Sequence, residues 1–324
     1  MDQIVKGFKI ANFLLSEIFK LFPIFVQLFI NCFISKSRKS VSGQLALVTG
    51  GSEGFGRALA FRLAQEGCNI AIASRNLENG QKTAEEIRNK YNVKVQAFQC
   101  DVSKREDVKR LKDEVKKSLG IVDLLINNAG LLPVTCSTLE GQDEEYQNIV
   151  DINMTSWMWT TRTFLPDMIQ QRRGHIVGIS SISTVCPIIS SAVYMATKYG
   201  NKGYMEGLRE DICFYEFSEF IKVTTAFPGF IKTNEDYFKL VFSNFHDYLI
   251  TVSEPDFVAE KIIDGVLKNY ENIFVSKFEM FQCWLLNSLP REVKTQCIKG
   301  SMPTNQRDKY LKMKLQQCKL LENY

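Results

Sequence analysis

A glycine-rich turn between an apolar run and a helix limits most strongly which fold this chain can adopt. The apolar run covers residues 45–48, the turn covers residues 49–56 (TGGSEGFG), and a helix is predicted over residues 57–66, ahead of Gly67. Glycines let the backbone bend tightly, and the N–H groups at the start of the helix stay free to bind an anion. The sequence therefore predicts a unit that holds a pyrophosphate group. The alternative is an ordinary connection between a strand and a helix.

Short apolar strands and amphipathic helices alternate through the rest of the chain. After the third strand, Ser103 and Glu106 are expected to form the capping box of a helix with one apolar face. Such alternation predicts a single α/β domain, in which a Rossmann-type, doubly wound parallel sheet carries helices on both faces. The predicted strands after the first cover residues 69–74, 94–100, 123–126, 175–180, 222–227 and 272–275.

The N-terminal flank differs in composition from this domain. Residues 8–34 are rich in Phe, Leu and Ile, but the least interrupted run, residues 21–34, is shorter than the ~20 residues of a spanning helix. A basic patch follows at residues 35–39 and favours the cytoplasmic side of a membrane. A cleaved signal peptide is the alternative, but no small-residue cleavage site follows the run. We expect residues 1–40 to be an uncleaved membrane anchor, either a tilted span or an in-plane or hairpin segment.

The C-terminal flank admits two interpretations. The predicted catalytic domain covers residues 41–276, and an extension covers residues 277–324. Within the extension, residues 278–289 are apolar and aromatic, and residues 307–321 are basic. The extension is either a packed surface helix with a frayed tail or a second contact with the membrane.

Composition excludes several classes of function. The net charge of 40 − 36 = +4 is too small to indicate binding of nucleic acid. The nine cysteines show no regular spacing, which indicates reduced thiols in a cytosol-like compartment. With only two histidines, His175 and His246, we expect no metal site.

The end of the second predicted strand bears on which nucleotide the turn would hold. An acidic residue there would accept hydrogen bonds from the ribose hydroxyls of NAD, but this chain has Ser74 and Arg75. A guanidinium suits the 2′-phosphate of NADP. Glu53 acts mildly against NADP, and a solvated loop charge is the alternative role for Arg75. We expect NADP(H) rather than NAD as the cofactor.

Further residues are expected beside this cofactor. An aspartate after the third strand can bond the adenine amino group, and the small and amide residues after the fourth strand leave room for the nucleotide. The residues of the first half of the domain expected at the cofactor are Gly50, Ser52, Gly54, Phe55, Gly56, Ser74, Arg75, Asp101, Val102, Asn128, Ala129 and Gly130.

The catalytic candidates are Tyr194, Lys198 and Ser181, which lies thirteen residues before the tyrosine. Residues four apart share one face of a helix, so Lys198 is predicted beside Tyr194. A nearby ammonium is expected to lower the pKa of Tyr194. The tyrosine could then act as general acid or base on a substrate oxygen, which Ser181 would orient by a hydrogen bond.

Taken in order, these motifs resemble those of the short-chain dehydrogenase/reductase family: TGxxxGxG, NNAG, a serine, YxxxK and PG. The resemblance covers about residues 43–275. It implies a catalytic tetrad in which Asn153 acts through a proton-relay water, Tyr194 is the acid or base, and Lys198 also holds the nicotinamide ribose. The residues that it adds at the cofactor are Tyr194, Lys198, Pro228, Gly229 and Thr233.

The flanks resemble one membrane branch of that family, the 17β-hydroxysteroid dehydrogenase type 11/13-like and epidermal retinol dehydrogenase-like proteins. The resemblance rests on the apolar N-terminus, the basic stretch and residues 160–166, 174–177 and 284–290. It implies an endoplasmic reticulum membrane or lipid droplet, with the catalytic domain facing the cytosol. Members commonly carry Asp at the end of the second strand, so Ser74-Arg75 departs from the branch.

The expected function is therefore NADP(H)-dependent interconversion of a lipophilic alcohol and its carbonyl compound, such as a retinoid, a steroid or a long-chain lipid. Aromatic residues at 237–248 are candidates for a lid over this substrate. Three alternatives remain open: a tethered reductase of a soluble substrate, which the aromatic lid disfavours, a catalytically silent lipid-droplet or membrane scaffold, and an NAD-dependent dehydrogenase of a steroid or retinol. The resemblance also implies a homodimer, formed through residues 147–163 and 191–217.

Overall fold

A seven-stranded parallel sheet forms the centre of the catalytic unit. The computed structural model describes residues 36–131, 142–184, 191–233 and 252–300. The chain divides into two units, residues 1–39 and 40–324, and every helix and strand below belongs to the second. The strands of the sheet are β1 (Leu45–Thr49), β2 (Asn69–Ser74), β3 (Val95–Gln99), β4 (Leu124–Asn127), β5 (Gly174–Ile179), β6 (Ile221–Phe227) and β9 (Asn272–Phe274).

The order of the strands across the sheet is β3-β2-β1-β4-β5-β6-β9, so the chain first moves outward from β1 and then returns to β4 beside it. This reversal confirms the predicted doubly wound topology. In such sheets ligands bind beyond the carboxyl ends of the strands, at the point of reversal. Two short strands that the sequence did not predict, β7 (Phe230–Ile231) and β8 (Val252–Ser253), pair with each other outside the main sheet.

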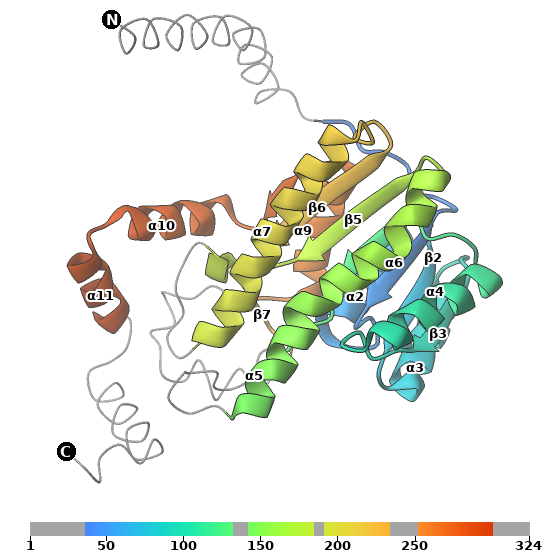
Figure 1. Cartoon of the computed structure of the whole chain (residues 1–324), viewed down its shortest axis with the longest axis horizontal. Coiled ribbons are helices and arrows are strands. Elements are labelled where there is room, and N and C mark those ends of the chain that lie inside the picture. Colours follow the sequence, from blue (N-terminus) through green and yellow to red (C-terminus); the bar gives the residue numbers. More distant parts are fainter. Residues whose placement is uncertain (1–35, 132–141, 185–190, 234–251, 301–324) are drawn as a thin grey trace, which may run out of the picture. The chain divides into compact units, whose positions relative to one another are not determined.

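Helices cover both faces of the sheet (Figure 1). The α-helices of the described residues are α2 (Gly54–Gln65), α3 (Leu77–Lys90), α4 (Arg105–Ser118), α5 (Asp143–Val150), α6 (Ser156–Gln170), α7 (Ala192–Phe214), α9 (Pro255–Leu267), α10 (Lys277–Ser288) and α11 (Arg291–Gly300). Apolar side chains of α2, α3 and α9 form one core with the sheet, and those of α4, α6 and α7 form a second core on the opposite face. Every residue of β1, β4 and β5 is buried, as expected for strands covered on both faces.

The predicted capping box before α4 is wrong. The helix begins at Arg105, and its N-cap residue, Lys104, makes no side-chain cap. The Ser103 hydroxyl instead donates a hydrogen bond to Asp101 Oδ1 (2.7 Å), while Glu106 pairs with Lys109 (2.8 Å). A capping box needs its serine at the N-cap position, and Ser103 lies one residue before it.

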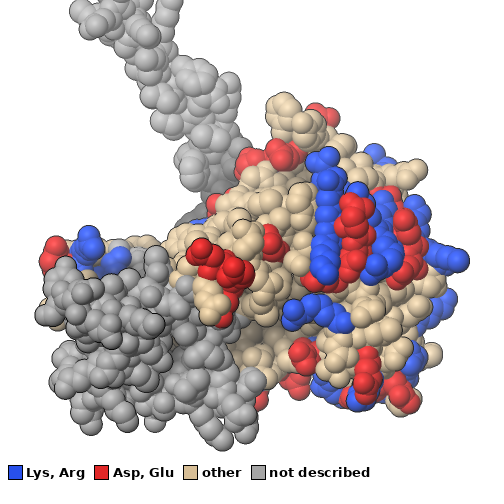
Figure 2. Space-filling view, turned by 60° about the horizontal axis from the view of Figure 1, so that its bottom comes forward, with Lys and Arg blue, Asp and Glu red and all other residues tan. Residues whose placement is uncertain are grey.

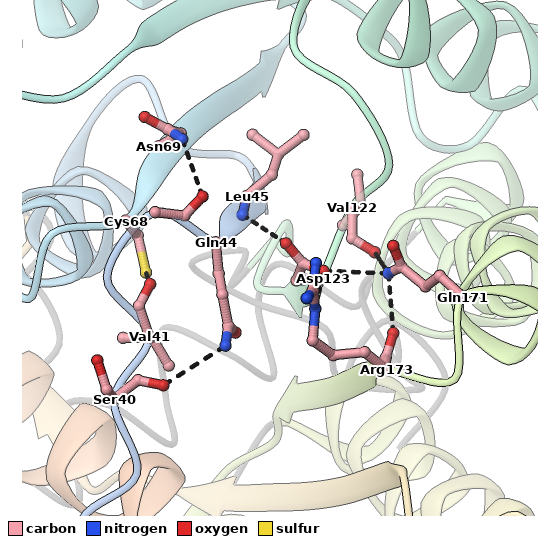
Figure 3. A network of polar contacts seen from close by, with 11 residues as sticks. Ser40, Val41, Gln44, Leu45, Cys68, Asn69, Val122, Asp123, Gln171 and Arg173 are labelled. Atoms are coloured by element: carbon pink, nitrogen blue, oxygen red, sulfur yellow. Dashed lines mark hydrogen bonds and ion pairs between the residues drawn. The ribbon is translucent and has the colours of Figure 1, made fainter.

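A polar network at the amino ends of the strands fixes the start of the catalytic unit (Figure 3). Buried Asp123 accepts hydrogen bonds from Leu45 N (2.8 Å), Arg173 Nε (2.7 Å) and Gln171 Nε2 (3.1 Å). Nearby, Asn69 Nδ2 donates to Gly43 O (3.1 Å). These bonds tie the first strand to β4 and α6 at the edge of the sheet opposite the expected ligand site.

Charged side chains of both signs lie next to one another on the face of the molecule seen in Figure 2. On α4, side chains of opposite charge form ion pairs: Lys109 with Glu106, and Arg110 with Asp107. Two further α4 lysines, Lys112 and Lys116, bond Asp167 of α6 at 2.9 and 3.0 Å and so join these two helices.

The flanks are only partly described. Nearly all of the expected anchor, the aromatic lid candidates at 237–248 and the basic tail at 307–321 lie outside the described residues. None of the helices in the described part of the chain is both long enough and apolar enough to cross a membrane.

Candidate active site

In the turn between β1 and α2, two backbone segments of the turn lie very close to each other. Gly50 adopts a φ of 64°, and its N–H donates to Ala73 O of β2 (2.8 Å). A Cβ on Gly56 would lie 2.0 Å from Gly50 O, so only glycine fits there. The N-cap residue of α2, Glu53, is exposed and makes no side-chain cap. The first N–H groups of α2 therefore have no capping side chain and can bind an anion.

The segments that follow β4 and β6 meet this turn. Asn128 Nδ2 donates to Thr49 O (2.9 Å), and Ala129 N donates to Thr49 Oγ1 (3.1 Å). A Cβ built on Gly54 would lie 3.6 Å from Thr233 Cβ, which places the residues after β6 beside the turn. Residues predicted at the cofactor from three separate parts of the sequence thus lie at one edge of the sheet.

At the end of β2 lie a pair of uncharged serine side chains and the exposed guanidinium of Arg75. Ser74 Oγ donates to Ser52 Oγ (2.7 Å), and both serines are buried. Arg75 is exposed, and no carboxylate of the described residues forms an ion pair with it that the structure records. The nearby Arg57 is neutralised by Glu86 and lies over the Phe61 ring, 4.4 Å from its centroid. The Arg75 guanidinium is therefore available to a phosphate at the end of β2.

Asp101 and Val102 follow β3 as predicted, but the Asp101 carboxylate has local partners. Its Oδ1 accepts hydrogen bonds from both the N–H (3.1 Å) and the hydroxyl of Ser103 (2.7 Å). Val102 is buried. These local hydrogen bonds stabilise the turn after β3. The other carboxylate oxygen of Asp101, Oδ2, lies 3.9 Å from Lys104 Nζ.

Tyr194 and Lys198 lie in the first two turns of α7, and both side chains are buried. Lys198 Nζ donates to Ile179 O at the end of β5 (3.1 Å) and lies 5.6 Å from the centre of the Tyr194 ring. Burial lowers the pKa of the Lys198 ammonium to about 8. Since that value is above 7, most of these groups still carry their charge at neutral pH. The charge therefore lies beside the tyrosine in a dry environment, where electrostatic effects are stronger.

Asn153 lies in a short π-helix, Asp151–Thr155, which joins α5 to α6. Both ends of its side-chain amide bond the backbone of Leu131. Oδ1 accepts a hydrogen bond from Leu131 N (2.6 Å), and Nδ2 donates one to Leu131 O (2.9 Å). Its own carbonyl accepts a hydrogen bond from Asn201 Nδ2 (2.7 Å). A Cβ on Gly130 would lie 3.4 Å from Asn153 Oδ1 and 3.8 Å from Lys198 Nζ, so these three residues adjoin one another.

Ser181 is the second residue after the end of β5 and is buried. Its hydroxyl accepts a hydrogen bond from Ser183 N (3.1 Å) and can still donate its own hydrogen to a substrate oxygen. Ile182 N donates to Pro228 O (2.9 Å), and Ser180 Oγ donates to Lys198 O (3.2 Å). The end of β5 is thereby fixed both to the segment after β6 and to the helix that carries the tyrosine and lysine.

The order of these motifs along the chain agrees with a comparison against protein families. The family model described as short chain dehydrogenase matches residues 44–237 of this chain. The chain belongs to the short-chain dehydrogenase family. Its membership confirms the resemblance inferred from the motifs and makes the protein an oxidoreductase by class.

Individual relatives of this dehydrogenase lie in the predicted branch. It is 32% identical to human epidermal retinol dehydrogenase 2 over 282 residues, 87% of this chain and 88% of the relative. It is 29% identical to human estradiol 17-beta-dehydrogenase 11, covering 85% and 90% of the two chains. A crystal structure of a metagenomic short-chain oxidoreductase in complex with NADP superposes with a TM-score of 0.61 at 25% identity, covering 73% of this chain and 98% of that chain.

Two residues of this dehydrogenase site were missed by the sequence analysis. Asn201 is fully buried and lies three residues after Lys198, so the spacing of Tyr194, Lys198 and Asn201 on one helical face could have identified it. Trp157 is also buried, and Lys198 Nζ lies 5.9 Å from the centre of its ring. Its contact with the lysine depends on how α6 packs on β5, and no local pattern indicates it. In the described part of the chain, no cluster of His, Cys, Asp or Glu side chains could hold a metal.

Proposed function

We propose that the protein is an NADP(H)-dependent oxidoreductase that interconverts a lipophilic alcohol and its carbonyl compound. The observation that carries this proposal is the buried Tyr194–Lys198 pair, placed between the end of β5 and the residues that adjoin the glycine-rich turn. A buried ammonium beside a phenol is suited to proton transfer at a substrate oxygen.

The residues of the site fit a dinucleotide. The uncapped start of α2, the close contact at Gly56 and the space at Gly130 form a cradle that a side chain would fill. Gly50, Ser52, Gly54 and Phe55 would line the pyrophosphate, and the segment with Pro228, Gly229 and Thr233 would face the nicotinamide. Bound there, the nicotinamide supplies or accepts a hydride at the substrate carbon.

The chain's own groups handle the proton. In the direction of reduction, the Tyr194 hydroxyl donates its proton to the substrate oxygen; in oxidation, the phenolate takes the proton back. The Lys198 ammonium stabilises that phenolate, and the Ser181 hydroxyl orients the substrate oxygen by donating a hydrogen bond. Asn153 holds the backbone of Leu131, which follows the Gly130 that adjoins Lys198.

NADP is proposed over NAD because of the end of β2. Ser74 places no negative charge there, and Arg75 is exposed and available to a 2′-phosphate. Glu53, the residue that would act against NADP, lies on the exposed side of the turn. The solved relative bound to NADP supports the same choice.

The proposed substrate class is supported by two relatives, which are named for retinol and estradiol. The experiment that tests the proposal is a screen of retinal, steroid ketones and long-chain aldehydes with NADPH and NADH. We expect NADPH consumption with at least one of these classes. If the folded protein binds NADPH but consumes none with any class, the silent scaffold is the better account.

Membrane attachment through residues 1–40 is part of the proposal, at the endoplasmic reticulum or a lipid droplet with the catalytic domain facing the cytosol. Deletion of residues 1–40 is expected to move most of the protein from the membrane pellet to the supernatant, because the longest apolar run and its basic flank both lie there. Fractionation of cells that express the full and the shortened chain measures this. A shortened chain that stays wholly in the pellet would contradict the assignment.

A homodimer is also proposed, with α7 as one contact face. Gly203 and Gly207 are exposed in the middle of this helix, and a Cβ on either would meet nothing within 4 Å. Each costs the helix about 1 kcal/mol relative to alanine, and no close packing against the described residues requires a glycine at either position. We expect Gly203→Leu with Gly207→Leu to yield a monomer by light scattering in detergent. Asp113→Leu, at an exposed position of α4, is the control, and an unmodified chain of monomer mass would refute the proposal.

A further inference from the structure

Helix α10 carries an uncovered aromatic face. The exposed fractions are 69% for Phe278, 53% for Phe281, 61% for Trp284 and 47% for Leu285. Residues three and seven apart lie on one side of a helix, so these four side chains form a single stripe. The rings of Phe281 and Trp284 stack on each other, with their centres 6.0 Å apart. Soluble monomers rarely leave a contiguous apolar surface of this kind in water.

The length of α10 decides how it could meet a lipid phase. Its twelve residues extend about 18 Å at a rise of about 1.5 Å per residue. The hydrocarbon core of a bilayer is about 30 Å thick. The helix is too short to cross it, so its apolar stripe can enter a lipid surface only while the helix lies in the plane of that surface.

The charge around the stripe selects the kind of surface. Residues 277–300 contain four Lys and Arg and two Glu, a net charge of 4 − 2 = +2. Arg291 and Val293 follow the helix, and both are exposed. A second exposed aromatic pair, Phe214 and Tyr215, lies within residues 210–220, which contain four acidic and no basic residues. Anionic headgroups would attract the first surface and repel the second.

We propose that α10 docks in the plane of an anionic phospholipid surface, with Phe278, Phe281, Trp284 and Leu285 inserted among the acyl chains. Arg291 then lies at the level of the headgroups. This contact is separate from the anchor and rests on the membrane attachment proposed for residues 1–40. It holds the catalytic unit itself, and not only its N-terminal tether, against the lipid from which a lipophilic substrate would come.

Tryptophan fluorescence of the full chain provides the test. The chain has three tryptophans; Trp157 is buried and Trp159 is half-buried with Arg105 over its ring at 5.3 Å, so Trp284 is the exposed one. The full chain is reconstituted into vesicles of phosphatidylcholine and phosphatidylserine whose acyl chains carry bromine, a quencher. We expect strong quenching that falls several-fold in Trp284→Phe and weakens when phosphatidylserine is left out.

Matched variants separate the docking of α10 on lipid from attachment through the anchor alone and from contact with a second copy of the chain. Phe278→Ser with Phe281→Ser is expected to reduce the quenching of Trp284, whereas Phe214→Ser with Tyr215→Ser is expected to leave it unchanged. A chain that floats with the vesicles but shows equal quenching with and without Trp284 overturns the docking of α10 and leaves the anchor intact. Trp284 emission that depends on protein concentration and not on lipid also overturns it, because a second copy then covers the face.

Discussion

Tyr194→Phe is expected to lower the turnover number by about 10²–10⁴-fold, the usual contribution of a positioned general acid or base. The change removes the hydroxyl and keeps the ring, which is buried against Ile149 and Val193. Without the hydroxyl, the group proposed to pass the proton to or from the substrate oxygen is lost. NADPH binding is expected to change little, because the glycine-rich turn and the Lys198 side chain are untouched. Steady-state kinetics and a fluorescence titration with NADPH measure the two quantities.

Tyr199→Phe is the matched control for this experiment. Tyr199 lies five residues farther along the same helix and is 44% exposed. Loss of its hydroxyl should leave both turnover and NADPH binding near those of the unmodified enzyme. Near-normal turnover by Tyr194→Phe, or an equal loss in the two variants, would remove Tyr194 from the role proposed for it.

Ser74→Asp together with Arg75→Ala is expected to reverse the preference of the enzyme from NADPH to NADH. A hydrogen bond to a charged group contributes about 1.5–3 kcal/mol, so loss of the arginine alone should raise the Michaelis constant for NADPH by about 10–100-fold. The new carboxylate repels the 2′-phosphate and accepts hydrogen bonds from the ribose hydroxyls of NADH. The quantity to measure is the ratio of the Michaelis constants for NADPH and NADH. A carboxylate at this buried position could also destabilise the protein, but that loss affects both constants equally and cancels in their ratio.

Lys82→Ala controls for the loss of a positive charge. Lys82 lies on α3, is exposed and pairs with Glu78 four residues earlier. Its removal should leave the ratio unchanged. An unmodified enzyme that uses NADH as well as NADPH would contradict the cofactor assignment and leave Arg75 as a surface charge.

The fold was predictable because its signals are local and repeated. Strands covered on both faces appear as short apolar runs, and β1, β2, β5 and β6 begin and end within one or two residues of the predicted bounds. The topology could be predicted because alternating strands and helices allow few arrangements. The capping box failed at Ser103 because α4 begins one residue later than the box requires, with Lys104 and not Ser103 at the N-cap, and sequence patterns place a helix start only to within a few residues.

The site was predictable where one helix or one turn places its residues. Tyr194 and Lys198 share a face by their spacing, and the turn after β1 follows from its glycines. Contacts between distant segments were not predictable. The hydrogen bonds of Asn153 with the Leu131 backbone join residues that are 22 apart in sequence. The ion pair of Arg57 with Glu86 joins residues that are 29 apart. The low pKa of Lys198 likewise depends on complete burial, which only packing creates.

The transfer of deuterium from labelled NADPH to the product would show both the hydride transfer and its dependence on Tyr194. The purified full chain is incubated with NADPH carrying deuterium at the transferable position of the nicotinamide, together with retinal, a steroid ketone or a long-chain aldehyde. Mass spectrometry of the product then locates the label. We expect the unmodified enzyme to yield an alcohol with one deuterium on the carbon that bore the carbonyl. The Tyr194→Phe variant should yield almost none of this product. Absence of labelled alcohol from every one of these carbonyl compounds, with folded protein that binds NADPH, would contradict the proposed function.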